Sequence, residues 1–466
     1  MKFESMIGWI RRTFATVFGR NANDKIDVLL SNGMSDAIAR WAKIFEGRPP
    51  WLGKNMPTAG LAPALAAEVA RLVVMEASIA ITGSVRADYL STQLEPLRFR
   101  LQNDVQLAAA MGGLLLKPLV SEGRIVVDAV QADCFYPIAF DSSGRMTSVV
   151  TAEQITRKGT IYTRLEYHSY LPGQHVIQNR AFASTTDVAI GKPIALDEIP
   201  EWASLSPEWT FTGVDRPLFA YLRMPFANRI DRSSPLGVSI YAGAEHLLQD
   251  ADEQYGRFLW EFEGGELAID LAEDYIHPGM DDSHAFQMPK GKQRLFRGLR
   301  LQDKNFYNVF SPTLRDASLK NGFNTILQRI EFNCGLAYGT LSDPQQVEKT
   351  AEEIRAGKQR SYATVSAIQR AVESAVDDLV YAMDVYSSQY HLAPSGAYSV
   401  ACDWGDSIVN DPQQRKTMFW QYVQAGKFPF WRYLVEFEGY TEEEARKIQS
   451  EQSQQMGDPY AEARLP

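Results

Sequence analysis

The sequence predicts a large α+β protein, and two patterns carry this prediction. Apolar residues recur at helical spacing in residues 1–100 and in long stretches after residue 238. Residues 114–223 are instead rich in β-branched and aromatic runs separated by turn signals. With 466 residues and 45% hydrophobic content, the chain can bury a sizeable core and form more than one folded unit.

Residues 1–100 are expected to be mainly helical, with breaks at Pro49–Pro50 and Pro57 and a further apolar-periodic stretch from Ala62 to Val85. The first helix is amphipathic and carries Arg11, Arg12 and Arg20. Two interpretations of it stay open: a helix packed on the body, or a basic helix lying on a membrane surface.

Residues 114–223 predict an antiparallel meander. The runs Ile161–Tyr170 and Val176–Phe182 are joined by the turn signal Leu171-Pro172-Gly173. His168 and His175 flank this turn, so we expect them at a hairpin tip rather than in a functional site.

After the meander, a long helix is expected over Val238–Phe262, ended by Gly264-Gly265. A small α/β insert follows, and Ser311-Pro312 then starts a second helix that ends near Gly335. A charged loop separates this helix from a third, long one over Tyr362–Ser387.

The C-terminal region is predicted to be helical. A strand is expected over Ser399–Trp404, Asp411-Pro412 caps one helix, and Thr441 with Glu444 forms a capping box for another. Aromatic residues cluster at 404 and at 427–431, where helix packing is favoured over base stacking because no basic stripe surrounds them.

Composition and missing motifs exclude several classes of function. The net charge of −10 argues against tight nonspecific DNA binding, which needs a basic surplus, although not against a surface that DNA slides past. The sequence contains no P-loop, nucleophile elbow or HExxH motif, so we expect no enzyme and no cofactor. No apolar run reaches the ~18 residues of a membrane span. The three cysteines are widely spaced and predict reduced, buried thiols.

Two groups of polar residues are candidate sites. His277, Asp281, Asp282 and His284 could bind a metal, but their order and spacing match no known site, so a solvated loop is favoured. Glu261 and Glu263 lie two residues apart on a helix and therefore cannot form an acid/base pair.

Several local motifs, in this order, resemble the portal proteins of tailed bacteriophages, in the lineage of siphophages of Gram-positive hosts. Ser239–Gly265, with Asp-x-x-Tyr and Trp-Glu-Phe, is similar to their stem helix. Gly339-Thr340-Leu341 followed by Val347–Ile354 is similar to the tunnel-loop region. The C-terminal resemblance lies in Trp404–Asp411, Gln424–Pro429 and Thr441–Ala445.

The resemblance implies a portal fold and assigns each segment a part in it. The parts are a wing at 1–235 and 362–405, a stem at 236–263 and 312–335, a clip at 264–311, a tunnel loop at 336–361, and a crown with its tail at 406–466. It also implies stem-packing residues, which are Leu247, Phe258, Phe262, Phe323 and Ile330. The tunnel-loop candidates for DNA contact are Lys349, Arg355, Lys358 and Arg360, each of which could instead pair with a neighbouring glutamate.

The resemblance further implies a structural ring, normally a dodecamer, at one capsid vertex of the virion, assembled in the host cytoplasm. Double-stranded DNA would pass through it during packaging and ejection. The implied partners are the terminase large subunit, a head-completion or adaptor protein, and the major capsid and scaffolding proteins. The competing hypotheses are a peripheral membrane scaffold that uses the N-terminal helix and a hydrolase with an unrecognised site.

Overall fold

The computed structural model describes residues 3–18, 28–53, 56–186, 189–272, 296–299, 306–343, 351–405 and 412–455. The chain forms two compact units. The first combines Met1–Glu348 with Ala363–Trp404, and the second combines Lys349–Tyr362 with Gly405–Pro466. Helices and sheets are both extensive, which confirms the predicted α+β class.

The N-terminal part of the first unit is helical, as predicted. Its helices are α1 (Phe3–Val17), α2 (Asn32–Phe45), α3 (Leu61–Val74) and α4 (Val85–Met111). The apolar stretch from Ala62 to Val85 is not one helix, because its last part forms strand β1 (Ser78–Thr82). There Ile79 and Ile81 alternate with exposed residues and point inward, and the strand pairs with β14 (Ser399–Asp403).

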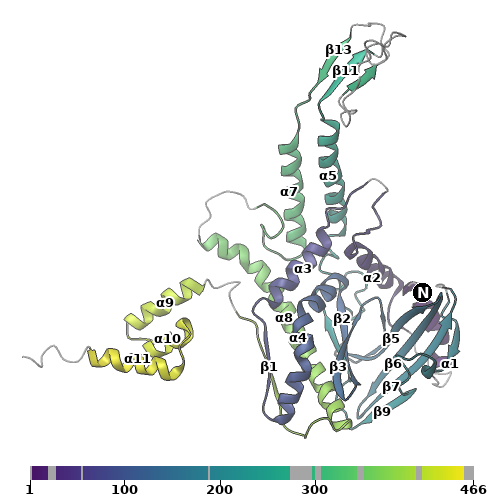
Figure 1. Ribbon diagram of the computed structural model, residues 1–466, viewed down its shortest axis with the longest axis vertical. Helices are drawn as coiled ribbons and strands as arrows, with labels where there is room; N and C mark the ends of the chain where they lie inside the picture. Colours follow the sequence, from purple (N-terminus) through teal and green to yellow (C-terminus); the bar gives the residue numbers. More distant parts are fainter. Residues whose placement is uncertain are drawn as a thin grey trace, which may run out of the picture. The chain divides into compact units, whose positions relative to one another are not determined.

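The predicted antiparallel meander is confirmed (Figure 1). Six strands form one sheet in the order β4-β5-β6-β7-β8, with β9 also paired to β7, and a second sheet has the order β10-β2-β3. The strands are β2 (Gly113–Ser121), β3 (Arg124–Gln131), β4 (Phe135–Phe140), β5 (Met146–Arg157), β6 (Thr160–Leu171), β7 (Gln174–Ser184), β8 (Lys192–Ile194), β9 (Glu208–Thr212) and β10 (Ala220–Arg223), with a short 3-10 helix η1 (Leu196–Glu198) after β8.

Helix α1 packs on the six-stranded sheet. The Phe14 ring lies 4.9 Å from that of Tyr167 on β6, and the Trp9 ring lies 5.3 Å from that of Phe182 on β7. The apolar face of α1 is therefore covered by protein, which supports the packed-helix interpretation over the membrane-surface one. No helix within the described residues is long and apolar enough to span a bilayer.

The next helix starts later than predicted. Helix α5 spans Glu245–Gly264 instead of beginning at Val238. Val238 and Ile240 are buried in the body, and the Ile240 N–H donates to the Ala109 carbonyl at 2.9 Å. Turns, and not a helix, therefore direct these apolar residues into the core.

Helix α7 (Asp316–Asn333) lies within the predicted second helix, and α8 spans Ala351–Gln389. The predicted loop at 336–361 is therefore helical from Ala351 onward. Ala, Glu, Arg, Lys and Gln dominate that stretch and are strong helix formers, so a high charge density was misread as a loop.

The second unit contains α9 (Pro412–Gln424), α10 (Phe430–Glu438) and α11 (Glu442–Gln455). The predicted capping box is confirmed, because the Thr441 N–H donates to Glu444 at 3.1 Å and the Glu444 N–H donates back to the Thr441 hydroxyl at 3.4 Å. The Phe419 ring packs on Phe428 and Phe437, so these aromatic side chains form a small core.

Candidate subunit interface and channel segment

Helices α5 and α7 run side by side as a helical hairpin that carries a small sheet at its far end (Figure 1). This sheet contains β11 (Ala268–Ala272), β12 (Phe296–Leu299) and β13 (Tyr307–Phe310) in the order β12-β11-β13. Strand β11 is parallel to β12 and antiparallel to β13.

Two carboxylates on α5 fix the base of the hairpin to the body. Glu245 accepts hydrogen bonds from Arg40 Nε and Trp41 Nε1, both at 2.6 Å. Asp252 is buried and accepts bonds from Trp51 Nε1 at 2.9 Å, the Thr58 hydroxyl at 3.1 Å and the Ala59 N–H at 2.7 Å. Buried carboxylates are costly unless they are satisfied in this way, so the segment that carries Trp51 and Thr58 stays attached to α5.

The two helices are joined along their length. Near the small sheet, Glu261 accepts hydrogen bonds from the Arg315 guanidinium at 2.6 Å and from the Arg315 N–H at 2.9 Å. Nearer the body, the rings of Tyr255 and Phe323 lie 6.3 Å apart, and Ile330 is fully buried.

The five stem-packing candidates differ in their surroundings. Ile330 contributes to the core of the single chain, and Leu247, Phe258 and Phe323 are half-buried. Phe262 is 42% exposed. The neighbouring Trp260, which was not selected from the sequence, is 64% exposed. On a helical wheel Trp260 lies on the side opposite Phe258, two positions away, so helical spacing alone would have marked it as outward-facing.

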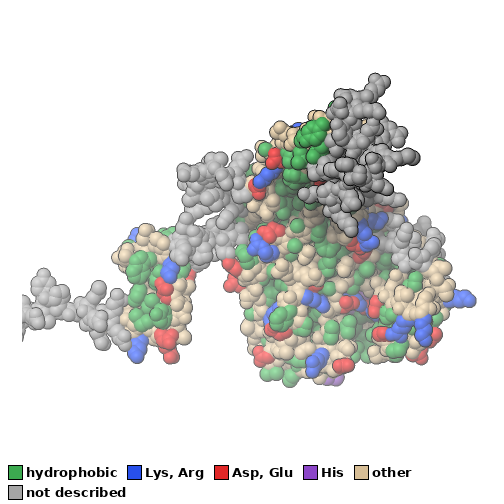
Figure 2. Space-filling model, turned by 45° about the horizontal axis from the view of Figure 1, so that its top comes forward, with side chains coloured by type: hydrophobic (Ala, Val, Ile, Leu, Met, Phe, Trp, Pro, Cys, Tyr) green, Lys and Arg blue, Asp and Glu red, His purple; other side chains and the backbone are tan. Residues whose placement is uncertain are grey.

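The far part of the hairpin and its sheet expose several large apolar side chains. These are Leu259, Trp260, Phe262, Leu267, Leu299, Tyr307 and Val309. Scattered exposed apolar residues are normal, but a group of them along one projecting element is typical of an interaction surface. Elsewhere on the face of the first unit shown in Figure 2, positive and negative side chains are interspersed.

The chain that leaves α7 is held by a buried glutamate. Glu331 is fully buried, and its carboxylate accepts hydrogen bonds from the N–H groups of Leu341 at 2.5 Å, Ser342 at 2.8 Å and Gly339 at 3.3 Å, and from the Ser342 hydroxyl at 2.9 Å. The Asp343 N–H donates to Asn324 on the same helix at 2.8 Å. Residues 335–343 therefore form an arm attached to α7.

The candidate channel residues follow this arm. Lys349 lies outside the described residues. Arg355, Lys358 and Arg360 fall on α8, so they are helical instead of lying in a loop. The side chains of Arg355 and Lys358 also lie outside the described part, whereas that of Arg360 is exposed and makes a contact within the chain.

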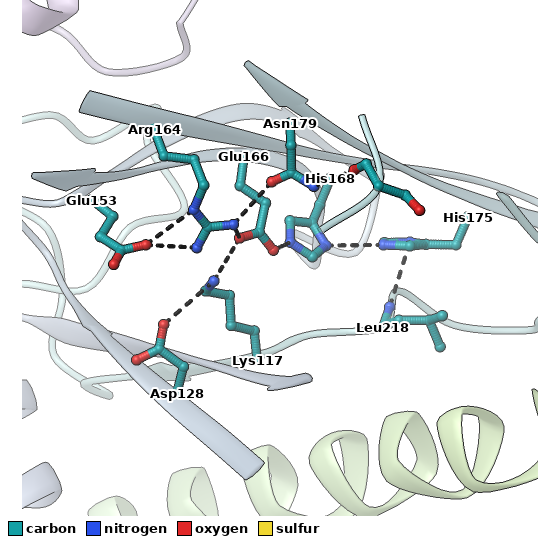
Figure 3. Close-up of polar contacts among 10 residues, drawn as sticks. Lys117, Asp128, Glu153, Arg164, Glu166, His168, His175, Asn179 and Leu218 are labelled. Atoms are coloured by element: carbon teal, nitrogen blue, oxygen red, sulfur yellow. Dashed lines mark hydrogen bonds and ion pairs between the residues drawn. The ribbon is translucent and has the colours of Figure 1, made fainter. Parts of the chain in front are cut away.

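A second polar cluster lies inside the first unit, around Glu166 (Figure 3). Lys117 on β2 and Arg164 on β6 each donate to Glu166 Oε2 at 2.7 Å. Burial alone would raise the pKa of Glu166, but the Lys117 ammonium and the Arg164 guanidinium hold this pKa well below its ordinary value. The ionised carboxylate thus links the two sheets of the body.

The two histidines expected at a hairpin tip belong to this cluster instead. The β6–β7 turn lies between Leu171 and Gln174, so both histidines flank it as predicted, but their side chains are buried. The Leu218 N–H donates to His175 Nδ1 at 3.5 Å, so His175 carries its proton on Nε2. It then donates to His168 Nδ1 at 3.1 Å, and His168 Nε2 donates to Glu166 at 2.7 Å. This chain of hydrogen bonds requires both rings to be neutral.

Mild acid is therefore expected to destabilise the body. Burial and the neighbouring His168 ring lower the pKa of His175 well below its ordinary value of 6.5. Below pH 6.5 the unfolded chain binds a proton that the folded chain does not, so stability is complete above this pH and falls as the pH drops. The slope approaches about 1.4 kcal/mol per pH unit.

Hydrogen exchange of β6 and β7, measured between about pH 7.5 and pH 5 and corrected for intrinsic rates, checks this expectation. His175→Gln should flatten the pH dependence, and the exposed His391→Gln serves as the matched control. An equally steep dependence in His175→Gln would show that another group is responsible.

The metal candidate of His277, Asp281, Asp282 and His284 lies outside the described residues. Within the described part, no group of three or more His, Cys, Asp or Glu side chains could hold a metal ion. Cys334 is buried as expected, whereas Cys134 and Cys402 are half-buried, and all three thiols are free.

No protein-family model matches the chain, and no curated protein matches it. Among solved structures, it is similar to a chain in the neck of a native GTA particle computed with C12 symmetry, at 11% identity and a TM-score of 0.38. The match covers 87% of this chain and 98% of that one. The TM-score is too low to assign a shared fold, so the function must be argued from this chain's own residues.

Proposed function

We propose that the chain is the subunit of a portal ring at one capsid vertex of a tailed phage, through which DNA is packaged and ejected. The observation that carries the proposal is the α5/α7 hairpin. It is firmly anchored to the body, yet it projects from it with large apolar side chains exposed along its far part. Such a surface needs a partner outside the single chain, and a ring of identical chains supplies one.

The segments then take the roles that the resemblance implies. The hairpin is the stem, the sheet of β11–β13 is the clip, the body with α8 and β14 is the wing, and α9–α11 form the crown. The clip would face the terminase large subunit and later an adaptor protein, while the wing would face capsid and scaffolding proteins. A net charge of −10 suits a conduit that must not hold DNA tightly.

Ring formation is tested directly by mass photometry and negative-stain microscopy of the purified chain. Particles should show a central hole and a mass that is a multiple of 52.3 kDa, with twelve copies as the expected number. A compact monomer at every concentration and salt condition would contradict the portal function.

The channel hypothesis makes its own prediction. On α8, Arg355 and Lys358 lie one turn apart on one side, whereas Arg360 lies on the opposite side. Only the first two can therefore face DNA together, as weak, sequence-independent contacts to phosphates. Arg355→Ala combined with Lys358→Ala should leave ring mass unchanged and lower packaged DNA per particle severalfold.

Arg360→Ala is the control for this pair, because it removes one positive charge from the other side of the helix, against two in the double variant. DNA protected from nuclease inside particles is the measurement. Equal losses per removed charge in the control and in the double variant would mean that overall charge matters, and that no particular side of α8 faces the DNA.

A further inference from the structure

The two outward faces of the helical hairpin differ in size and charge. On α5, residues three or four positions apart line one face and include long, charged and aromatic side chains: His246, Asp250, Glu253, Arg257 and Trp260. On α7, the first part of the exposed face consists of small residues, and a cation and an aromatic ring follow: Ala317, Ser318, Asn321, Gly322, Thr325, Arg329 and Phe332, which is 47% exposed. Neither Asp250 nor Arg329 has an ion-pair partner within the described ranges.

Contacts inside the hairpin fix which residues are level with each other. Glu261 pairs with Arg315, and Tyr255 packs on Phe323, so the two helices are antiparallel. For any two residues that lie at the same height along the hairpin, one on each helix, the sum of their residue numbers is therefore nearly constant. Trp260 is therefore level with Ala317. Asp250 is level with Leu327, about 3 Å along the axis from Arg329.

A ring with cyclic symmetry brings two different surfaces together at the same height along its axis. The hairpin presents two such surfaces, and they are complementary in shape and charge. The α5 face offers a large indole and the carboxylates of Asp250 and Glu253. The α7 face offers small side chains at the height of the indole and a guanidinium near the height of the carboxylates.

We propose that a second copy of this chain binds each outward face of the hairpin, an inference that rests on the proposed ring. Trp260 of one copy packs on Ala317, Ser318 and Asn321 of the next, and Asp250 pairs with Arg329 of the next. The small residues let the indole approach closely, and buried Trp residues commonly dominate interface energies. The ion pair fixes the direction in which neighbours join.

The test is a charge exchange at the pair. Asp250→Arg alone and Arg329→Asp alone each place like charges across the interface and should shift mass photometry of the purified chain toward monomers. The double variant restores the opposite charges and should recover the ring. Both residues are exposed in the single chain, so circular dichroism of all three variants should match the wild type.

Trp260→Ala tests the apolar contact and should raise the dissociation constant between subunits about thirtyfold or more. Phe99→Ala is the matched control, because Phe99 is 88% exposed on α4 and lies outside the hairpin. Rings that persist in both single charge variants and in Trp260→Ala would overturn this interface and leave the ring itself standing. A wild-type chain that forms no ring would instead overturn the proposed function.

Discussion

Glu166→Ala is expected to destabilise the body by about 3–5 kcal/mol, because removing one partner of a buried ion pair leaves the other charges uncompensated. In the variant, Lys117 would keep only Asp128, at 3.3 Å, and His168 would lose its acceptor. Because the chain forms two compact units, the loss is best measured locally, as faster hydrogen exchange in β2, β6 and β7.

Glu153→Ala is the matched control, because Glu153 contacts the same Arg164 but has a side chain 46% exposed. A surface partner of this kind contributes less than about 1 kcal/mol. If the two variants lost the same stability, burial of Glu166 would not be the source of its effect, and the link between the two sheets would be unimportant.

This cluster could not be predicted from sequence for a physical reason. Along β6, Arg164, Glu166 and His168 alternate with Leu165 and Tyr167, a pattern typical of a sheet with one polar face in water. The polar face is instead covered, and one of the two cations that neutralise Glu166, Lys117, is 49 residues away from it in the chain. Local periodicity correctly predicted the strands, but it carries no information about what lies over them.

The candidate interface and the channel segment were likewise only partly predictable from the sequence. Helical spacing predicted both helices of the hairpin, and it identified Ile330, which is buried within the single chain. It placed the start of α5 too early, and it singled out the apolar stripe but not the opposite, outward face that carries Trp260. The charged stretch before Tyr362 was predicted as a loop because it lacks apolar residues, yet a helix in such a place needs only residues with high helix propensity.

Glu331→Ala is expected to release residues 335–343 from α7 at a cost of about 3 kcal/mol. Hydrogen bonds to a charged group contribute roughly 1.5–3 kcal/mol, and the buried donors would be left without their acceptor. Hydrogen exchange should accelerate at Gly339, Leu341 and Ser342, while the amides in the middle of α7 keep their protection.

Glu331→Gln separates the roles of the two carboxylate oxygens. Its remaining oxygen can still accept from the Leu341 and Ser342 N–H groups, whereas its NH₂ group faces the Gly339 N–H and the Ser342 hydroxyl, so exchange should rise at Gly339 first. If the arm positions the proposed channel segment, Glu331→Ala should also lower packaged DNA without changing ring mass, as the Arg355 and Lys358 double variant should. Normal packaging with a released arm would show that the position of the segment is set by α8 and not by α7.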